Sequence, residues 1–246
     1  MTLSGNKPVV EVCLTPDLFH HYHATNAIVV AIDILRATSS ICVALQYGAL
    51  SVVPVMTIEE SYAYKQKGFL IGAERQGSMV EGFDLGNSPF SYMDEKIQGR
   101  HIALTTTNGT QAINLAQKHA DRVVAGSFLN IDVLANWLIE QNKNVICLCA
   151  GWKNTFNLED TLFAGALTQK LLPHFAHSPH RDSALAAINL YQQAKDDMYA
   201  YLGQSSHRMR LEKLKIDEDV IYCLTPNQTL VIPVLHNGAL IRHTDI

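Results

Sequence analysis

The amino-acid sequence predicts an α/β protein with three layers, α/β/α, in which a mostly parallel sheet lies between helices. Three segments support this prediction, because in each a short β-branched apolar run ends in small polar residues and passes directly into a helical pattern. The segments are AIVVAIDILRATSSICVALQYGA (27–49), HIALTTTNGTQAINLAQKHA (101–120) and NVICLCAGWKNTFNLEDTLFAGALTQKLL (144–172). Strands that alternate with helices build parallel βαβ units with helices on both faces of the sheet.

The individual elements follow from the same patterns. The three buried strands are predicted at residues 28–32, 102–105 and 145–149. The helices after them are predicted at residues 38–47, ended by Gly48, then from 109 or 110 onward, and at about 158–172. Shorter strands are predicted at 52–55, 69–71, 122–124 and 229–233, with helices at 58–67 and 131–141. Residues 173–180 are predicted as a loop, followed by a long helix over 182–202 and a short capped helix over 205–214.

Composition narrows the class of protein. The 246 residues fit one domain, with two α/β lobes that divide near residues 126–145 as the alternative. A formal net charge of −4 and a sequence without a Lys/Arg run argue against a nucleic-acid partner. The apolar stretches of the sequence are too short to span a membrane.

The N-terminal stretch and the cysteines both favour a cytoplasmic protein. MTLSGNKPVVEV lacks the apolar core of a secretion signal. The cysteines form no C-x-x-C pair and mostly occur in apolar runs, so they are expected to be reduced core residues. They are Cys13, Cys42, Cys147, Cys149 and Cys223.

The stretch TTTNGT (105–110) joins a predicted strand to a helix, and this arrangement can bind an anion. The free N–H groups and the dipole of the helix start favour a phosphate, and Gly109 lets the backbone approach it closely. The hydroxyls of Thr106 and Thr107 can donate to phosphate oxygens. The alternative is that Asn108 or Thr110 merely caps the helix, and at this point both interpretations stay open.

Asp33 and Arg36 lie in IDILRATSS, directly after the strand predicted at 28–32. A buried carboxylate is costly unless a cation or a metal meets it. Asp33 is therefore a candidate nucleophile or magnesium ligand, and Arg36 a candidate anion-binding fork. The alternative is a structural ion pair between the two residues that also caps the helix.

The glycine-rich stretch GAERQGSMVEGFDLGNSP (72–89) is long enough for a functional loop. Glu74 and Arg75 follow the strand predicted at 69–71, so they belong at the carboxyl edge of the sheet, where ligands bind in such folds. Asp84 and Asn87 lie later in the same stretch. Glu81 is expected to be solvated.

Two further acidic groups lie in the first turn of a predicted helix and directly before an apolar run. Glu159 and Asp160 begin the third helix, where adjacent carboxylates suit a hard cation, and Lys153 before them could neutralise an anionic group. Acids in a first helical turn are also stabilised by the helix dipole, with Asn157 as the cap, so a structural role is the alternative. In KIDEDVIYCL, Asp219 is the acid expected to point inward.

Together these residues predict a chemistry. Acids and anion-binding groups at one edge would repel a phosphate unless a divalent cation bridges them, and magnesium binds both carboxylate and phosphate oxygens. The histidines show no zinc-binding spacing and are expected mostly in loops or at the surface. The prediction is a magnesium-dependent enzyme that acts on a small phosphorylated anion.

The same motifs resemble a known family. IDILRATSS, GAERQG, GFDLGNSP, TTTNGT, GSFLN, CAGW with NLED, and EDVIYC are similar, in the same order and over nearly the whole chain, to the 2-phosphosulfolactate phosphatase (ComB-like) family. The resemblance implies an α/β/α fold and a Mg²⁺-dependent phosphoric monoester hydrolase. It also implies hydrolysis of 2-phospho-3-sulfolactate to 3-sulfolactate and phosphate, in the route to coenzyme M.

The resemblance implies a site but leaves individual roles open. Asp33, Arg36 and Glu74 are the catalytic candidates. The substrate-binding candidates are Arg75, Asn87, Thr106, Thr107, Asn108, Gly109 and Lys153, of which Arg75 and Lys153 would meet the sulfonate and carboxylate. The metal-binding candidates are Asp33, Asp84, Glu159, Asp160 and Asp219, with Glu74 as a further acid. Phosphatase activity on another small acidic monoester, or a non-catalytic module that binds anionic metabolites, is the alternative function, and a homodimer is the candidate assembly.

Overall fold

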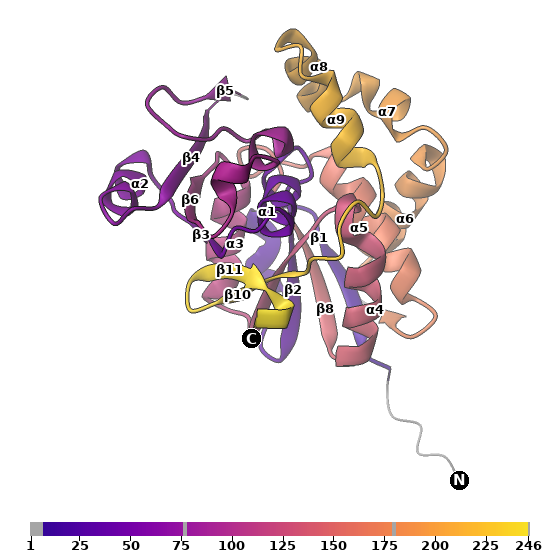
Figure 1. Cartoon of the computed structure of the whole chain (residues 1–246). Helices are drawn as coiled ribbons and strands as arrows, with labels where there is room; N and C mark the ends of the chain where they lie inside the picture. Colours follow the sequence, from indigo (N-terminus) through magenta and orange to yellow (C-terminus); the bar gives the residue numbers. More distant parts are fainter. Residues whose placement is uncertain (1–6, 76–77, 179–180, 246) are drawn as a thin grey trace.

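The structure of the chain, a computed structural model, describes residues 7–75, 78–178 and 181–245. Gln76 of GAERQG, His180 of the predicted loop and residues 1–6 of the N-terminal stretch lie outside this part. The centre of the described molecule is a sheet of eleven strands (Figure 1). In sheet order the strands are β5 (Ser78–Met79), β4 (Leu70–Arg75), β6 (His101–Thr105), β3 (Ser51–Pro54), β11 (Ala239–Arg242), β10 (Pro233–His236), β7 (Arg122–Gly126), β2 (Ala27–Ile32), β8 (Asn144–Cys149), β1 (Val9–Cys13) and β9 (Ala176–His177).

Two groups of parallel strands make up most of this sheet. β3, β6 and β4 pair in parallel, and so do β7, β2, β8, β1 and β9. The antiparallel hairpin β10–β11 lies between the groups and pairs with β7 on one side and β3 on the other. Its turn, Asn237–Gly238, has left-handed φ angles of 49° and 81° at both residues, as a two-residue hairpin turn requires.

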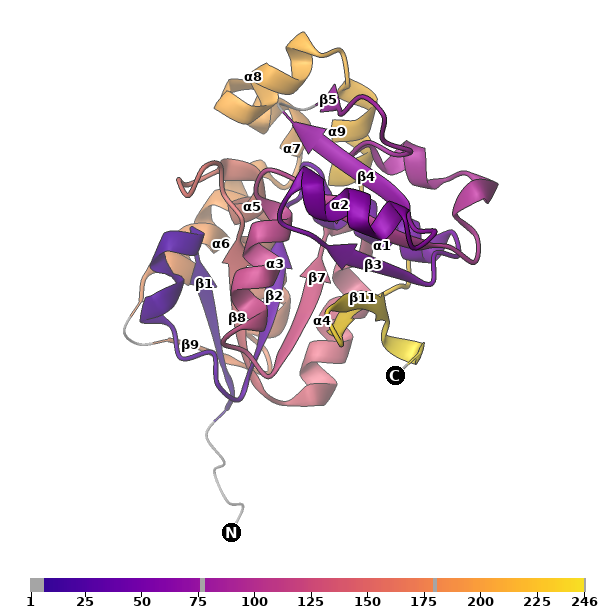
Figure 2. The same ribbon diagram turned by 90° about the vertical axis from the view of Figure 1, so that its left-hand side faces the viewer.

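The antiparallel hairpin changes how the loops meet. Three successive antiparallel pairings lie between β3 and β7. The strands of one parallel group therefore point in the opposite direction from the strands of the other group. The expectation that all three polar loops share one edge of a single parallel sheet is therefore wrong. The sheet twists strongly between the groups, and Figure 2 shows β3 running across the view while β7 runs up it. The carboxyl ends of both groups consequently converge.

Helices cover both faces of the sheet, so the predicted α/β/α fold is confirmed. The helices are α1 (Ala37–Gln46), α2 (Ile58–Lys65), α3 (Gly109–Gln117), α4 (Ile131–Gln141), α5 (Leu158–Leu171), α6 (Ser183–Ala194), α7 (Met198–Tyr201), α8 (Ser206–Lys213) and α9 (Asp217–Leu224). Successive residues of β2 point to opposite faces of the sheet and pack into the hydrophobic core on each face. Val30 and Ile32 pack on the side of α4 and α5, whereas Val29 and Ala31 pack on the side of α1 and α3.

The sequence predicted the main elements closely. The predicted strand–helix pairs correspond to β2–α1, β6–α3 and β8–α5, each within one or two residues, and Gly48 follows α1 with a φ of 97°. The helix predicted at 131–141 is α4, and the capped helix is α8, where the Ser205 hydroxyl accepts from Arg208 N at 3.1 Å. All five cysteines are buried and unpaired, as expected of reduced core residues.

Three predictions of secondary structure were wrong or incomplete. The strand predicted at 229–233 begins at Pro233, because Thr229 N donates to the carbonyl of Leu129 instead of to a strand. The helix predicted at 182–202 breaks after Ala194, and Asp197 caps a new short helix, α7, by accepting from Ala200 N. β1 was not predicted, and the loop predicted at 173–180 contains the short strand β9.

The last helices, α7 to α9, lie together at the end of the sheet toward which β4 and β2 point (Figures 1 and 2). Segments far apart in the sequence therefore meet at this end of the molecule. Among the described residues, no helix combines the length and the apolar character needed to cross a bilayer.

Candidate active site

A pocket of about 380 Å³ lies between the converging strand ends and α8. Six of the residues predicted to form a site line it: Asp33, Arg36, Glu74, Asn87, Asn108 and Lys153. They come from the segments after β2, β6 and β8, from the end of β4 and from GFDLGNSP. Convergence of these six residues from five separate segments makes this pocket the candidate active site.

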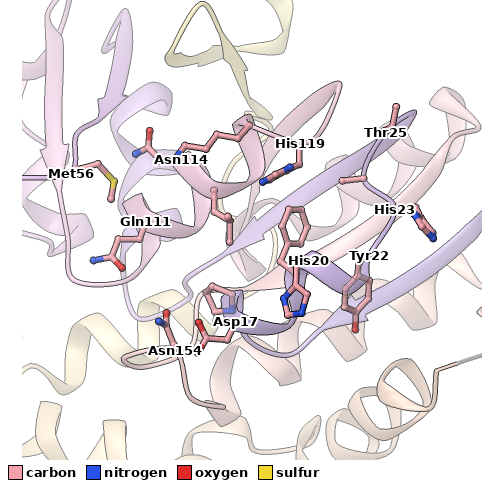
Figure 3. A pocket seen from close by; sticks show the side chains of 15 residues that line it. Asp17, His20, Tyr22, His23, Thr25, Met56, Gln111, Asn114, His119 and Asn154 are labelled. Atoms are coloured by element: carbon pink, nitrogen blue, oxygen red, sulfur yellow. The ribbon is translucent and has the colours of Figure 1, made fainter.

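A second, larger cavity of about 720 Å³ runs between α3 and the short helix η1 (Pro16–His21). Figure 3 shows His20, Tyr22, His119 and Asn114 around it. Asp17 supplies the one carboxylate among the described residues that line this cavity. Because phosphoryl chemistry needs acids and cations that face each other, the smaller pocket is the better candidate, in spite of its size.

Asp33 lies at the floor of the pocket, where β2 ends. Its carboxylate is buried, and its Oδ1 accepts from Ala37 N at 3.3 Å, at the start of α1. Burial raises the pKa of Asp33 to about 6, and the negative charges of Glu74 and Glu159 add to the rise, while His207 opposes it. A carboxyl with a raised pKa in a pocket is typical of a functional site.

Arg36, the other charged residue of the loop after β2, binds to α9. The guanidinium of Arg36 forms a buried ion pair with Asp219 of α9. Asp219 also accepts from the hydroxyl of Ser88, in GNSP, at 3.0 Å. Asp219 thus points inward, as expected, and ties the loop after β2 to GNSP and to α9. The alternative of a simple helix-capping pair between Asp33 and Arg36 does not describe this arrangement.

The TTTNGT loop borders Asp33 directly. A Cβ atom placed on Gly109 would lie 2.6 Å from Asp33 Oδ2 and 2.6 Å from Ala37 Cβ, so only glycine fits. Asn108 occupies the N-cap position of α3 without a side-chain cap hydrogen bond, and the hydroxyl of Thr106, two residues earlier, accepts from Thr110 N at 3.2 Å. Asn108 instead accepts from Lys153 N at 3.0 Å and joins this loop to the loop after β8. The helix start therefore is capped and also faces the pocket.

Glu74, at the end of β4, approaches the same loop. Its Oε2 accepts from the hydroxyl of Thr107 at 3.4 Å. Arg75 turns back toward the sheet, where it donates to the carbonyl of Glu74 at 2.7 Å and to the hydroxyl of Thr105 at 3.2 Å. Arg75 is not among the described residues that line the pocket.

Asp84 lies apart from the pocket. Its carboxylate accepts from Ile71 N at 3.0 Å and from Lys65 Nζ at 3.4 Å, on the flank of β4 that faces α2. GFDLGNSP thus contributes Asn87 to the pocket, and Asp84 fastens the preceding part of the stretch to the sheet.

Asp160, in the first turn of α5, is buried behind Asp33. It accepts from Ile34 N at 2.9 Å, Gly151 N at 3.2 Å and the Asn157 side chain at 2.8 Å. Burial raises the pKa of Asp160 well above its usual value, and the charges of Asp33 and Glu159 add to that rise. Its hydrogen bonds connect the loops after β2 and β8.

Glu159 contacts the opposite wall of the pocket. Its Oε1 lies 2.5 Å from His207 Nδ1 and accepts from Asn157 at 3.1 Å. Asn157 occupies the N-cap position of α5, as the structural alternative has it, but its side chain donates to Glu159 and Asp160 and makes no cap hydrogen bond. The fully buried Glu159 therefore orients an imidazole that lines the pocket.

The sequence did not predict that α8 forms a wall of the pocket. His207, Arg210 and Lys213 line the pocket from α8, together with Trp152 from the loop after β8. The signal was the spacing i, i+3, i+6 of basic residues in SHRMRLEK, which places them along one side of a helix. Nothing in the sequence alone shows that this helix folds back over the strand ends.

The pocket contains the oxygen donors that magnesium prefers. Within residues 7–75, 78–178 and 181–245, no group of three or more His, Cys, Asp or Glu side chains is placed to hold a metal. Asp33 and Glu74 nevertheless line the pocket with Asn87, whose Oδ1 is buried and has no hydrogen-bond partner in the described part of the chain. Magnesium is commonly held by one or two carboxylates and completed by phosphate and water, so this donor set fits it.

Comparisons with known proteins show the family to which the chain is similar. The family model described as 2-phosphosulpholactate phosphatase matches residues 13–238. A probable 2-phosphosulfolactate phosphatase of Thermotoga petrophila is 40% identical over 212 residues, which are 86% of this chain and 90% of the relative. One of Clostridium beijerinckii is 32% identical over 235 residues, 94% of this chain and 98% of the relative. The range matched by the family model, residues 13–238, includes the five segments that build the pocket.

Proposed function

Because the chain belongs to the 2-phosphosulpholactate phosphatase family, we propose that it hydrolyses 2-phospho-3-sulfolactate to 3-sulfolactate and phosphate with the help of Mg²⁺. The observation that carries the proposal is the contact between Gly109 and Asp33. It brings a buried carboxylate with a raised pKa next to the amino end of α3, where backbone N–H groups attract a phosphoryl group.

In this proposal the phosphoryl group binds at the start of α3, between Asn108 and Asp33. Asp33 then either attacks phosphorus to form an acyl-phosphate that water hydrolyses, or takes a proton from an attacking water. Arg36, held by Asp219, supports the negative charge that the transferred group carries. The products are inorganic phosphate and the free 2-hydroxyl of 3-sulfolactate.

Magnesium would be held by Asp33, Glu74 and the Asn87 amide oxygen. The bound ion would neutralise phosphoryl oxygens that these acids would otherwise repel. We assign the remaining candidate ligands Asp84, Glu159, Asp160 and Asp219 supporting roles, because their carboxylates already bind other groups of the chain. Asp160 and Asp219 hold the loop that carries Asp33, whereas Glu159 orients His207 and Asp84 fastens the stretch before Asn87 to the sheet.

The alternatives are a phosphatase for another small acidic monoester and a module that binds such metabolites without hydrolysis. Phosphate release from 2-phosphosulfolactate, 2-phospholactate and phosphoglycolate, each with and without Mg²⁺, separates them. Preference for phosphosulfolactate in the presence of Mg²⁺ is the expected result. Preference for another ester would show that the substrate is that ester and not 2-phosphosulfolactate. Binding of the esters without phosphate release would support the non-catalytic metabolite-binding module. A cytoplasmic homodimer in the route to coenzyme M stays a prediction.

A further inference from the structure

The pocket has two chemically different walls. Asp33 and Glu74 supply acids on the side of the strand ends, whereas α8 supplies His207, Arg210 and Lys213 on the other side. Arg36 and Lys153 add two cations near the strand ends, so a ligand that fills the pocket would meet oxygen donors and cations there and a second group of cations at α8. This arrangement fits a small molecule that carries a phosphate at one end and a second anionic group at the other.

Arg210 is the best placed of these cations. Its guanidinium carbon lies 4.1 Å from the centre of the Trp152 ring, so one face of the group is covered by the indole. The N–H donors of a guanidinium lie in its plane, so stacking leaves them free to bind an oxyanion side-on. Arg210 Nη2 is buried and has no hydrogen-bond partner in the described part of the chain. An orphaned charged donor of this kind is expected to pair with a ligand.

The rest of α8 holds this arginine in place. Arg208, on the opposite side of the helix, is buried and forms an ion pair with Asp217 Oδ1 at 2.5 Å. The same guanidinium stacks on Tyr199, 4.5 Å from its ring centre. Leu211 is buried in the core shared with α5 and α6. Arg210 is therefore presented by a fixed helix, which favours a specific contact.

We propose that Arg210, stacked on Trp152, binds the sulfonate of the substrate and so determines the preference for a sulfonated ester. The inference rests on the proposed function, since it assigns one group of the proposed substrate. Sulfonate presents three oxygens and keeps its charge throughout the neutral range, so a guanidinium fork can bind two oxygens at once. His207 and Lys213 surround the same end of the pocket, and Lys153 is left for the carboxylate. Arg75, the earlier candidate for a distal anion, binds the sheet edge instead.

The test compares two substrates that differ only in the sulfonate. We expect Arg210→Gln to lower kcat/KM for 2-phosphosulfolactate by about 30-fold or more, the size expected for a charge-assisted hydrogen bond, and for 2-phospholactate by less than about 5-fold. Lys195→Gln is the matched control, because it removes one positive charge from the exposed end of α6, away from the pocket. Equal losses on both substrates would overturn the assignment and leave the phosphatase proposal intact.

A binding measurement separates this inference from the proposed function. Calorimetric titration with 3-sulfolactate and with lactate needs no turnover. We expect the wild-type protein and Lys195→Gln to bind 3-sulfolactate more tightly than lactate, and Arg210→Gln to lose that difference. If phosphosulfolactate is not hydrolysed but this difference is seen, the proposed activity fails and the sulfonate site stands. If Arg210→Gln binds 3-sulfolactate as the wild type does, the sulfonate site is overturned.

Discussion

Gly109, at the start of α3, lies so close to Asp33 that an added Cβ atom would be 2.6 Å from the Asp33 Oδ2 atom. The two residues come from different groups of parallel strands and meet only because the sheet turns between those groups. Their contact fixes the carboxylate against the backbone of the helix start.

Gly109→Ala is expected to displace this carboxylate. Since the added methyl group would also contact Ala37 Cβ at 2.6 Å, something must shift, and we expect kcat/KM to fall by about 100-fold. Steady-state kinetics check the result. Gly203→Ala is the matched control, because no described atom lies within 4 Å of a Cβ there. A Gly109→Ala enzyme with near-normal kinetics would show that the contact is not needed.

Asp33→Asn is expected to abolish turnover and preserve the fold. The amide keeps an oxygen that can accept from Ala37 N, but it can neither attack phosphorus nor take a proton. We expect kcat to fall by about 1,000-fold or more. Phosphate release and circular dichroism measure the two effects, and substantial remaining activity would remove Asp33 from the chemistry.

The same substitution makes a prediction about pH and stability. Because burial raises the pKa of Asp33 from 3.8 to about 6, the folded protein holds this proton more tightly than the unfolded chain does. Below the unfolded-state pKa of 3.8, Asp33 is protonated in both states, and its ionisation does not change the free energy of unfolding. As pH rises, ionisation of Asp33 in the unfolded chain lowers that free energy, and the loss is complete above the folded-state pKa of about 6. In EDTA, Asp33→Asn should stabilise the protein by about 3 kcal/mol near pH 7.5 and by much less near pH 4.5. Urea unfolding at the two pH values measures this, and a pH-independent difference would contradict it.

Removal of magnesium is expected to stop the reaction. After treatment with EDTA, activity should be lost and should return with added Mg²⁺. Asn87→Ala should raise the Mg²⁺ concentration for half-maximal activity by about 10-fold or more, since it removes a buried oxygen donor. Undiminished activity in EDTA would refute the metal requirement, whereas an unchanged Mg²⁺ dependence in Asn87→Ala would refute only the role of Asn87.

Asp219→Ala is expected to destabilise the fold. It removes the carboxylate that pairs with the buried Arg36, and loss of one partner of a buried ion pair costs about 3 kcal/mol. Chemical unfolding measures the change. Glu218→Gln is the control, because Glu218 is the exposed neighbour in the same helical turn. Equal stability of the two variants would mean that the Arg36–Asp219 pair contributes little.

The sequence predicts this fold best where the signals are local. β2, β6 and β8 were found because each apolar run is followed at once by a polar loop and a helix. The hairpin β10–β11 was missed although HNGA contains the Asn-Gly turn signal, because each of its strands has only four residues. Thr229, placed in a strand by its neighbours Val231 and Ile232, instead bonds to Leu129 across the molecule. That contact cannot be read from periodicity.

The residues of the candidate site also differ in whether a local sequence signal predicts them. Asp33, Asn108 and Lys153 could be predicted because they lie in the loops that follow strands, and the end of a strand locates them at the carboxyl edge. Arg210 could not be predicted, since α8 reaches the pocket through the burial of Arg208 and Leu211 rather than through any strand. The partner of Arg36 was also missed, because Asp219 lies 183 residues later in the chain.

The position of the hairpin between β3 and β7 has a consequence for how the chain is made. β10 and β11 are synthesised after all the other described strands. They nevertheless connect the parallel group that contains β6, before Thr106, to the parallel group that contains β2, before Asp33. On the ribosome, each parallel group can form early from its own strands, but the two groups stay without their connecting strands until residues 233–242 have emerged. Assembly of the pocket is thus expected only after residues 233–242 have been made, and nascent chains that stop before the hairpin should lack phosphatase activity.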